Sequence, residues 1–254
     1  MDPVGAKRTV GIALGAVALL GGVGALGVIG VIAIINSISF DPIDIDDIAP
    51  EPERQVSVAT PAAAEDDPEW LGRTAEATGI PERALAAYVA ADARVRAEGC
   101  EVGWNTLAGI GWVESHHGTL QGGAIDADGV ARPAIIGIPL DGTNDTMAIP
   151  DTDGGELDGD TEWDRAVGPL QFIAETWRIW GVDASGDGTA DPHSIDDAAA
   201  TAATYLCRID GTLATEESWV RAVRSYNDMF DYQVRVATAA ERYAEAATAP
   251  ETQP

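Results

Sequence analysis

The alternation of apolar and polar residues divides the chain into three parts. Residues 10–35 carry no charged side chain, and an apolar run of this length can cross a bilayer core of about 30 Å. Residues 36–67 are acidic, contain four prolines and lack periodicity, which predicts an extended tether. From residue 68 to 247 apolar residues recur at helical spacing, which predicts one folded domain, and residues 248–254 are expected to form a disordered tail.

Helix start and stop signals predict a mainly α-helical domain. The expected boundaries follow from three signals: a glycine after an apolar stripe, a proline in a first turn, and a Ser or Thr cap. The helices expected on this basis are 68–79, 81–99, 105–118, 168–180, 194–208, one that begins at Thr215, and 231–247.

Residues 121–165 interrupt this helical pattern with many glycines and aspartates and a few short apolar pieces. A segment of this length is too long for a plain connection in a compact domain. We therefore expect an irregular insertion with a β-hairpin, of the kind that often shapes a binding cleft.

The charges around the apolar run predict its orientation. Lys7 and Arg8 precede the run, and no Lys or Arg follows it closely. This bias places residues 1–9 in the cytoplasm and the folded domain outside a cell membrane that the chain crosses once. The alternative is a cleaved signal peptide, because residues 37–39 read Ser-Ile-Ser, but the run is longer than a typical signal core and favours an uncleaved anchor.

Composition narrows the choice of partners. With 42 acidic and 15 basic residues the chain has a formal net charge of −27, which argues against a nucleic-acid ligand but not against a glycan. Cys100 and Cys207 are the only cysteines. In an extracytoplasmic domain they are expected to form a disulfide that stabilises the fold by up to about 4–5 kcal/mol, and two buried free thiols are the alternative.

The segment 105–118 contains a carboxylate in an unusual place. Read as a helix, it aligns Leu107, Ile110, Gly111 and Glu114 in the i, i+3, i+4, i+7 stripe that normally faces a core. Removing a carboxylate from water raises its pKa, and a carboxyl that stays protonated near neutral pH can act as the general acid of glycoside cleavage. The alternative is that Glu114 lies at the exposed end of the helix.

Three sequence pieces together resemble a known family. They are WVESHHG at 112–118, AVGPLQF at 166–172 with Trp177 following, and Ser225-Tyr226-Asn227. In this order and spacing they resemble the lysozyme-like lytic transglycosylases of peptidoglycan, in particular the B-type murein transglycosylases as they occur in actinobacteria. The resemblance covers about residues 68–246 and implies a lysozyme-like fold.

The resemblance implies a site and a reaction. Glu114 matches the single catalytic acid, which protonates the bond between N-acetylmuramic acid and N-acetylglucosamine and then deprotonates the muramoyl 6-hydroxyl, so that a 1,6-anhydro end forms. Gln171 matches an amide that holds sugar, and Tyr226 and Asn227 match the pair beside the acid. Ser115 could hold the carboxylate or a sugar. The implied substrate is peptidoglycan, no cofactor is required, and cell-wall synthesis or division proteins are conceivable partners.

Each residue also has a purely structural interpretation. Gln171 could cap a backbone, and Tyr226 lies on an apolar helix face where most tyrosines belong to the core. Trp177 and Trp180 could stack on sugars, but aromatic residues at this spacing more often belong to the core, and Trp112 is likewise expected to be structural. His116 and His117 occupy unspecified positions of the motif and lack zinc-site spacing, so we expect them at the rim of the site.

An acidic loop follows the second motif. Asp183, Ser185 and Asp187 alternate as in the start of an EF-hand, but Ser194 stands where a bidentate Glu is required. B-type transglycosylases have a longer calcium loop here, and that match makes Asp197 the distal ligand. Asp197 also completes an S-x-x-D capping box with Ser194, and one carboxylate cannot serve fully in both roles. A structural calcium site and an ion-free turn therefore both remain open.

Two other functions remain as alternatives to a lytic transglycosylase. A hydrolytic muramidase would require a second acid, for which Asp126, Glu162 and Asp164 in the insertion are candidates. A non-catalytic peptidoglycan-binding scaffold would not need Glu114, so the intact set of site residues weighs against it.

Overall fold

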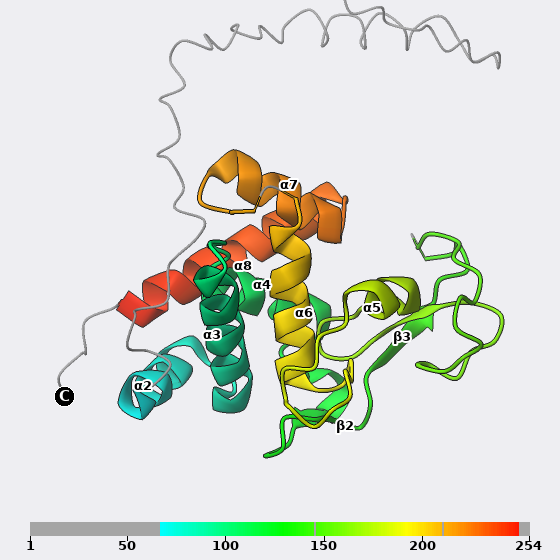
Figure 1. Cartoon of the computed structure of the whole chain (residues 1–254), viewed down its shortest axis with the longest axis horizontal. Coiled ribbons are helices and arrows are strands. Elements are labelled where there is room, and N and C mark those ends of the chain that lie inside the picture. Colours follow the sequence, from blue (N-terminus) through cyan, green and yellow to red (C-terminus); the bar gives the residue numbers. More distant parts are fainter. Residues whose placement is uncertain (1–66, 145, 210, 249–254) are drawn as a thin grey trace, which may run out of the picture. The chain divides into compact units, whose positions relative to one another are not determined.

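The computed structural model describes residues 67–144, 146–209 and 211–248, and these are mainly helical, as predicted (Figure 1). The α-helices in this part of the chain are α2 (Pro68–Thr78), α3 (Glu82–Ala97), α4 (Trp104–Ser115), α5 (Ala174–Trp180), α6 (Ile195–Cys207), α7 (Glu216–Tyr226) and α8 (Phe230–Thr248).

The first helices begin and end where local chemistry requires. The Asp67 carboxylate accepts hydrogen bonds from the backbone N–H groups of Glu69 and Trp70 and so caps α2. Gly79 ends α2 in the left-handed conformation with φ of 72°, as predicted. Pro81 is the N-cap of α3 rather than its first helical residue, one position from the expectation.

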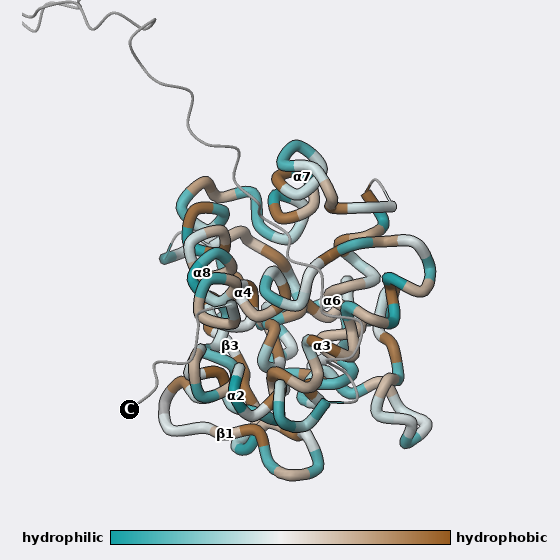
Figure 2. The backbone as a smooth tube through the Cα atoms, turned by 90° about the vertical axis from the view of Figure 1, so that its left-hand side faces the viewer, coloured by the Kyte–Doolittle hydropathy of each residue, from teal (hydrophilic) through white to brown (hydrophobic). Residues whose placement is uncertain are grey.

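Helix α4 lies at the centre of the helical packing. Its residues from Trp104 to Gly111 are all buried, and α8 packs along it, while α3 and α6 lie side by side (Figure 1). A Cβ atom at Gly109 would come within 2.8 Å of the Val236 carbonyl oxygen, so glycine allows the two helices to approach closely. Along the other helices hydrophobic and hydrophilic segments alternate, as expected for helices with one buried face (Figure 2).

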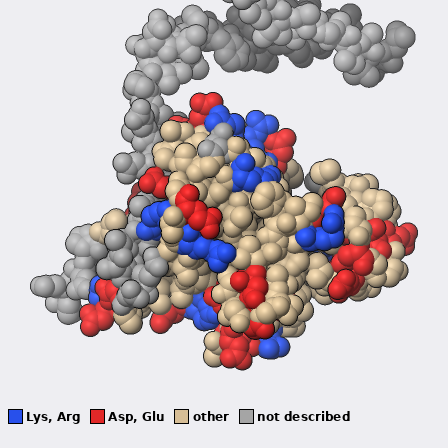
Figure 3. Space-filling view, in the orientation of Figure 1, with Lys and Arg blue, Asp and Glu red and all other residues tan. Residues whose placement is uncertain are grey.

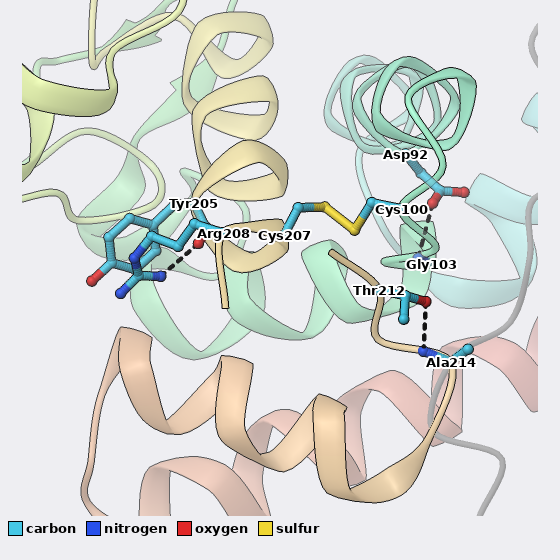
Figure 4. The surroundings of a disulfide bond; sticks show 8 residues. All are labelled: Asp92, Cys100, Gly103, Tyr205, Cys207, Arg208, Thr212 and Ala214. Carbon is cyan, nitrogen blue, oxygen red and sulfur yellow. Dashed lines mark hydrogen bonds between the residues drawn. A yellow bond between two sulfur atoms is a disulfide. The ribbon is translucent and has the colours of Figure 1, made fainter. Parts of the chain in front are cut away.

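A disulfide joins Cys100, just after α3, to Cys207 at the end of α6, as predicted (Figure 4). The two Cα atoms are 6.1 Å apart. Next to it, the Arg208 guanidinium stacks on the Tyr205 ring, 3.3 Å from its centre. The bridge therefore fixes the ends of the two neighbouring helices.

The insertion contains two short antiparallel sheets, which agrees with the expected hairpin. Strand β1 (Ala124–Ile125) pairs with β2 (Ala131–Arg132), and β3 (Ile136–Pro139) pairs with β4 (Arg165–Val167). A short 3-10 helix, η2 (Leu120–Gly122), precedes them. Acidic side chains gather on the surface on the side where Figure 1 shows this insertion (Figure 3).

The predicted helix 168–180 is wrong in its first half, because α5 begins only at Ala174. Residues 168–172 form a tight turn in which Val167 and Phe172 exchange backbone hydrogen bonds of 2.8 and 2.9 Å. Gly168 has φ of 79°, and a side chain there would collide with the Pro192 carbonyl. Proline at 169 also disfavours a helical residue before it.

The predicted membrane-spanning run 10–35, nearly all of the tether 36–67 and the tail beyond residue 248 fall outside the described residues. Among the helices of the described part, none is both long enough and apolar enough to cross a membrane.

Candidate active site

Two hydrogen bonds bring the three motif segments together around the turn 168–172. The Ser115 hydroxyl, at the end of α4, donates to the Pro169 carbonyl at 2.6 Å. The Tyr226 hydroxyl, at the end of α7, donates to the Leu170 carbonyl at 2.7 Å. The ends of two helices and the turn that carries Gln171 are thus held against one another.

Glu114 lies in the last turn of α4 and is half-buried. Its Oε1 accepts a hydrogen bond of 2.7 Å from the hydroxyl of Tyr232 on α8. Burial raises the pKa of Glu114 to about 7, although the Tyr232 hydrogen bond and the positive charge of Arg235 both lower it. Near neutral pH the carboxyl therefore exists in both protonation states.

The sequence did not single out Tyr232 or Arg235. Tyr232 is one of the buried residues of α8. Arg235 follows one turn later on the same side of α8, and its side chain is exposed. The spacing of these two residues on an amphipathic helix was the only available signal, and it does not by itself indicate proximity to Glu114.

Tyr226 stacks on Tyr232, which in turn donates a hydrogen bond to Glu114. The two rings stack almost in parallel, at 7° and with 6.5 Å between their centres, and Phe172 packs against the Tyr226 ring at 5.7 Å. Burial raises the pKa of Tyr226, and the charge of Glu114 adds to this effect. Tyr226 therefore belongs to the surroundings of Glu114 as well as to the core.

Gln171 and Asn227 make hydrogen bonds within the protein. The Gln171 backbone is left-handed, with φ of 49°, and its amide donates to the Gly168 carbonyl at 2.9 Å. Its Oε1 faces Gly137 of β3, where a Cβ atom would lie 3.0 Å away. Asn227 accepts a 3.0 Å hydrogen bond from the Met229 N–H and so closes the turn into α8. Their contact with sugar remains a prediction.

Ser115 has a role that the sequence did not indicate. It is fully buried, its single hydroxyl proton is donated to Pro169, and its oxygen accepts from the Gly118 N–H at 2.7 Å. No donor is left for the Glu114 carboxylate, so this arrangement favours a structural role at the end of α4.

The two histidines after the acid differ in their surroundings. His116 is half-buried and stacks on Trp112 with 4.0 Å between ring centres. His117 is only 2% exposed, so its predicted place at the rim is wrong. Both have positive φ and turn the chain back at the end of α4, which therefore stops at Ser115, before the predicted Gly118. Trp177 is buried, as expected for a core residue.

Two of the candidate second acids have hydrogen-bond partners of their own, and the third is exposed. Asp164 is buried, and its two oxygens accept hydrogen bonds from the backbone and hydroxyl of Thr152. Asp126 binds Arg132 and the backbone of its own turn, and Glu162 is exposed. Within the described residues, the charged group that shifts the pKa of Glu114 is Arg235, not a carboxylate.

In the loop 183–197 the expected calcium ligands make hydrogen bonds within the loop, including one of 3.3 Å from the Ser185 hydroxyl to Asp183. Asp197 is buried and accepts three backbone N–H groups, from Ala184, Ser185 and Asp191, at 2.7–3.0 Å. Ser194 caps the Asp197 N–H, but the Asp197 side chain faces the loop, so the predicted capping box is formed only in part. The oxygens of Asp183 and Asp187 likewise accept backbone N–H groups. Calcium binding by this loop stays a prediction.

Among the described residues, the group of three or more potential metal ligands that converge is Asp151, Asp153 and Asp164, with ligand atoms within 4.8 Å of one another. Their oxygens accept hydrogen bonds from the backbone and Thr152 hydroxyl of the same loop. These carboxylates thus order the backbone of the loop that carries them.

Comparison with known proteins adds one finding. The family model of the Transglycosylase SLT domain matches residues 151–252. The matched region contains Gln171, Tyr226, Asn227 and Tyr232, whereas Glu114 precedes it. No curated protein and no solved structure matches the chain. The match covers 102 of the 254 residues, fewer than half of the chain, and shows a similarity to this domain.

Proposed function

We propose that the protein is a peptidoglycan lytic transglycosylase of B-type character with a lysozyme-like domain, in which Glu114 is the single general acid and base. The observation that carries this proposal is the half-buried Glu114 carboxyl, with a pKa of about 7, at the junction of the three motif segments. The Transglycosylase SLT domain match to residues 151–252 supports the reaction class.

The reaction requires one proton to pass through Glu114. The protonated carboxyl donates to the glycosidic oxygen as the bond to the muramoyl anomeric carbon breaks. The resulting carboxylate then accepts the proton of the muramoyl 6-hydroxyl, whose oxygen attacks that carbon and closes the 1,6-anhydro ring. No water is consumed, and a pKa near 7 suits both proton transfers.

Tyr232 and Arg235 assist the step in which Glu114 becomes charged. The Tyr232 hydroxyl donates to the carboxylate, and the Arg235 guanidinium attracts it. Both lower the pKa of a group that burial alone would keep neutral. They therefore stabilise the carboxylate that must form after the first proton transfer.

The surroundings of Glu114 favour an internal nucleophile over a hydrolytic mechanism. Most glycosidases pair two carboxyl groups, one of which activates water or attacks the sugar. The carboxylates of Asp126 and Asp164 are engaged in an ion pair and hydrogen bonds of their own, and Glu162 is exposed. A reaction in which the substrate supplies its own hydroxyl needs no second acid.

The test is a product analysis with the full chain and purified cell-wall sacculi. The wild type is expected to release fragments with 1,6-anhydromuramoyl ends, and Glu114→Gln should lose activity by at least about a hundredfold. Glu156→Gln is the matched control, because it neutralises an exposed glutamate of the insertion, and it should cleave normally. Reducing ends would instead indicate a muramidase, and binding without fragments a scaffold.

We further propose that residues 10–35 anchor the enzyme in the cell membrane, with the helical domain outside. The support is the uncharged run after Lys7 and Arg8. Protease added to intact spheroplasts should degrade the domain, and the chain should stay in the membrane fraction after a salt wash. Release by salt would contradict the anchor.

A further inference from the structure

His117 lies in a buried polar site formed by three helices. A hydrogen bond of 3.2 Å joins its Nδ1 to the hydroxyl of Tyr88 on α3. A second, of 2.8 Å, joins its Nε2 to the hydroxyl of Tyr243 on α8. A neutral imidazole has one donor and one acceptor nitrogen, so two flanking hydroxyl groups satisfy it completely.

The backbone places this ring beside the helix that carries the acid. His117 follows Glu114 by three residues, has φ of 58°, and donates its N–H to the Gly111 carbonyl at 2.9 Å. The chain thus folds back along α4. A side chain at Gly111 would collide with the Tyr88 hydroxyl and lie 3.4 Å from His117 Nδ1, so this glycine makes room for the site.

Helix α8 connects the His117 site to Glu114. Tyr232 and Tyr243 are both on α8, eleven residues apart, which is close to three helical turns and places them on the same side. Tyr243 binds His117, and Tyr232 binds Glu114. The segment 114–117 therefore holds α8 at two points.

We infer that His117 is a positioning residue, which fixes α8 along α4 through Tyr243 and thereby keeps the Tyr232 hydroxyl on the Glu114 carboxylate. The structural part of this inference concerns the free protein. Its catalytic consequence rests on the proposed transglycosylase function.

The groups around His117 keep it neutral. Burial lowers its pKa to about 3, and the neighbouring His116 and Arg242 contribute in the same direction. Arg242 also donates to the Tyr243 hydroxyl at 3.0 Å. His117 therefore does not titrate in the range where Glu114 does.

The titratable and charged groups that act on Glu114 are few. They are Tyr232 and Arg235 from α8, which lower its pKa, and Tyr226 from α7, whose own pKa rises in response to the Glu114 charge. A displacement of α8 that loosens the Tyr232 hydrogen bond should therefore raise the pKa of Glu114.

Two substitutions cut the link between His117 and α8 from opposite sides. His117→Asn keeps a residue that tolerates positive φ and can still reach Tyr88, but it is too short for Tyr243. Tyr243→Phe removes a single oxygen atom. Tyr232→Phe serves as the reference, since it deletes the hydrogen bond to Glu114 directly.

Thr106→Val is the matched control for general loss of stability. Thr106 is buried at the other end of α4 and accepts a 3.0 Å hydrogen bond from the Trp219 indole. Its replacement removes a buried hydrogen bond of the same helix without touching α8 near Glu114. It should lower the melting temperature and leave the titration of Glu114 unchanged.

The measurement is a ¹³C NMR titration of the Glu114 carboxyl in the full chain, with the signal assigned by its absence in Glu114→Gln. We expect His117→Asn and Tyr243→Phe to raise the Glu114 pKa in the direction of Tyr232→Phe. The double variant should add nothing to the larger single shift, because both changes cut one link.

An unchanged or lowered Glu114 pKa in both His117→Asn and Tyr243→Phe, beside a raised pKa in Tyr232→Phe, would overturn the inference. If one variant does not fold, the other decides. The titration uses no substrate, so its outcome is independent of sacculus cleavage. Absence of cleavage by the wild type would contradict the proposed function and leave the positioning role to be judged by NMR alone.

Discussion

The carboxyl group of Glu114 at the end of α4 and that of Asp160 in the acidic insertion have opposite surroundings. Asp160 accepts backbone N–H groups from Glu162 and Trp163 and pairs with Arg165, and these donors lower its pKa. Glu114 has one hydroxyl donor and is half-buried, and burial raises its pKa to about 7. In a chain with 42 acidic residues, hydration and the number of donors decide which carboxyl can act as an acid.

The largest expected effect on stability comes from replacing Glu114 by Gln. Its folded pKa of about 7 lies above the reference value of 4.5, so wild-type stability falls as pH rises from about 4.5 to about 7. Gln carries no charge and can still accept the Tyr232 hydrogen bond. We expect Glu114→Gln to be more stable above pH 7 by up to about 3 kcal/mol.

Thermal unfolding of the full chain, followed by tryptophan fluorescence at several pH values, checks this expectation. The difference between the two proteins should vanish near pH 4. A constant difference at all pH values would mean that the Glu114 carboxyl is hydrated like an ordinary surface glutamate.

A smaller effect is expected for Arg235→Gln. Removing the exposed guanidinium should raise the Glu114 pKa slightly, and added salt should reduce the difference, because exposed charges are screened. Arg224→Gln is the control, since Arg224 is exposed on α7 and pairs with Asp228. Equal shifts in the two variants would show that Arg235 acts only through net charge.

The smallest effect, and one of opposite sign, is expected for Asp160→Asn. Because the folded pKa of Asp160 is lowered, its charge stabilises the fold above the unfolded pKa of about 3.8, and this contribution is lost as pH falls through the lower folded value. The variant should melt below the wild type at pH 7, with the difference shrinking toward pH 3. If Asp160→Asn were more stable than the wild type at pH 7, the charge of Asp160 would not stabilise the fold, and its contrast with Glu114 would be refuted.

Periodicity and local signals predicted the helices and the motif segments well. The stripe of Leu107, Ile110 and Gly111 that leads to Glu114 is buried as expected, and the glycine after α2 ends it. The helix predicted from residue 168 was wrong because tertiary contact at Gly168 and the proline after it impose a turn. The local sequence pattern could not reveal that the Pro192 carbonyl lies against Gly168.

Tertiary contacts account for the parts of the site that sequence reasoning missed. Tyr232 and Arg235 meet Glu114 only because α8 packs along α4, more than a hundred residues away in sequence. His117 was expected at the rim but is buried. Its burial depends on the left-handed turn and on hydroxyl groups from α3 and α8, which the local sequence does not reveal. Long-range partners of this kind leave no spacing signal in a single sequence.

The dependence of anhydro-end formation on pH tests the central role of Glu114 most directly. The rate of release from sacculi by the full chain should fall as pH rises, with an inflection near 7, because the reaction starts from the protonated carboxyl. Removing the Tyr232 hydroxyl should move this inflection upward. A rate that stays constant from pH 5 to 9, or an inflection near 4.5, would contradict a partly dehydrated Glu114 as the acid.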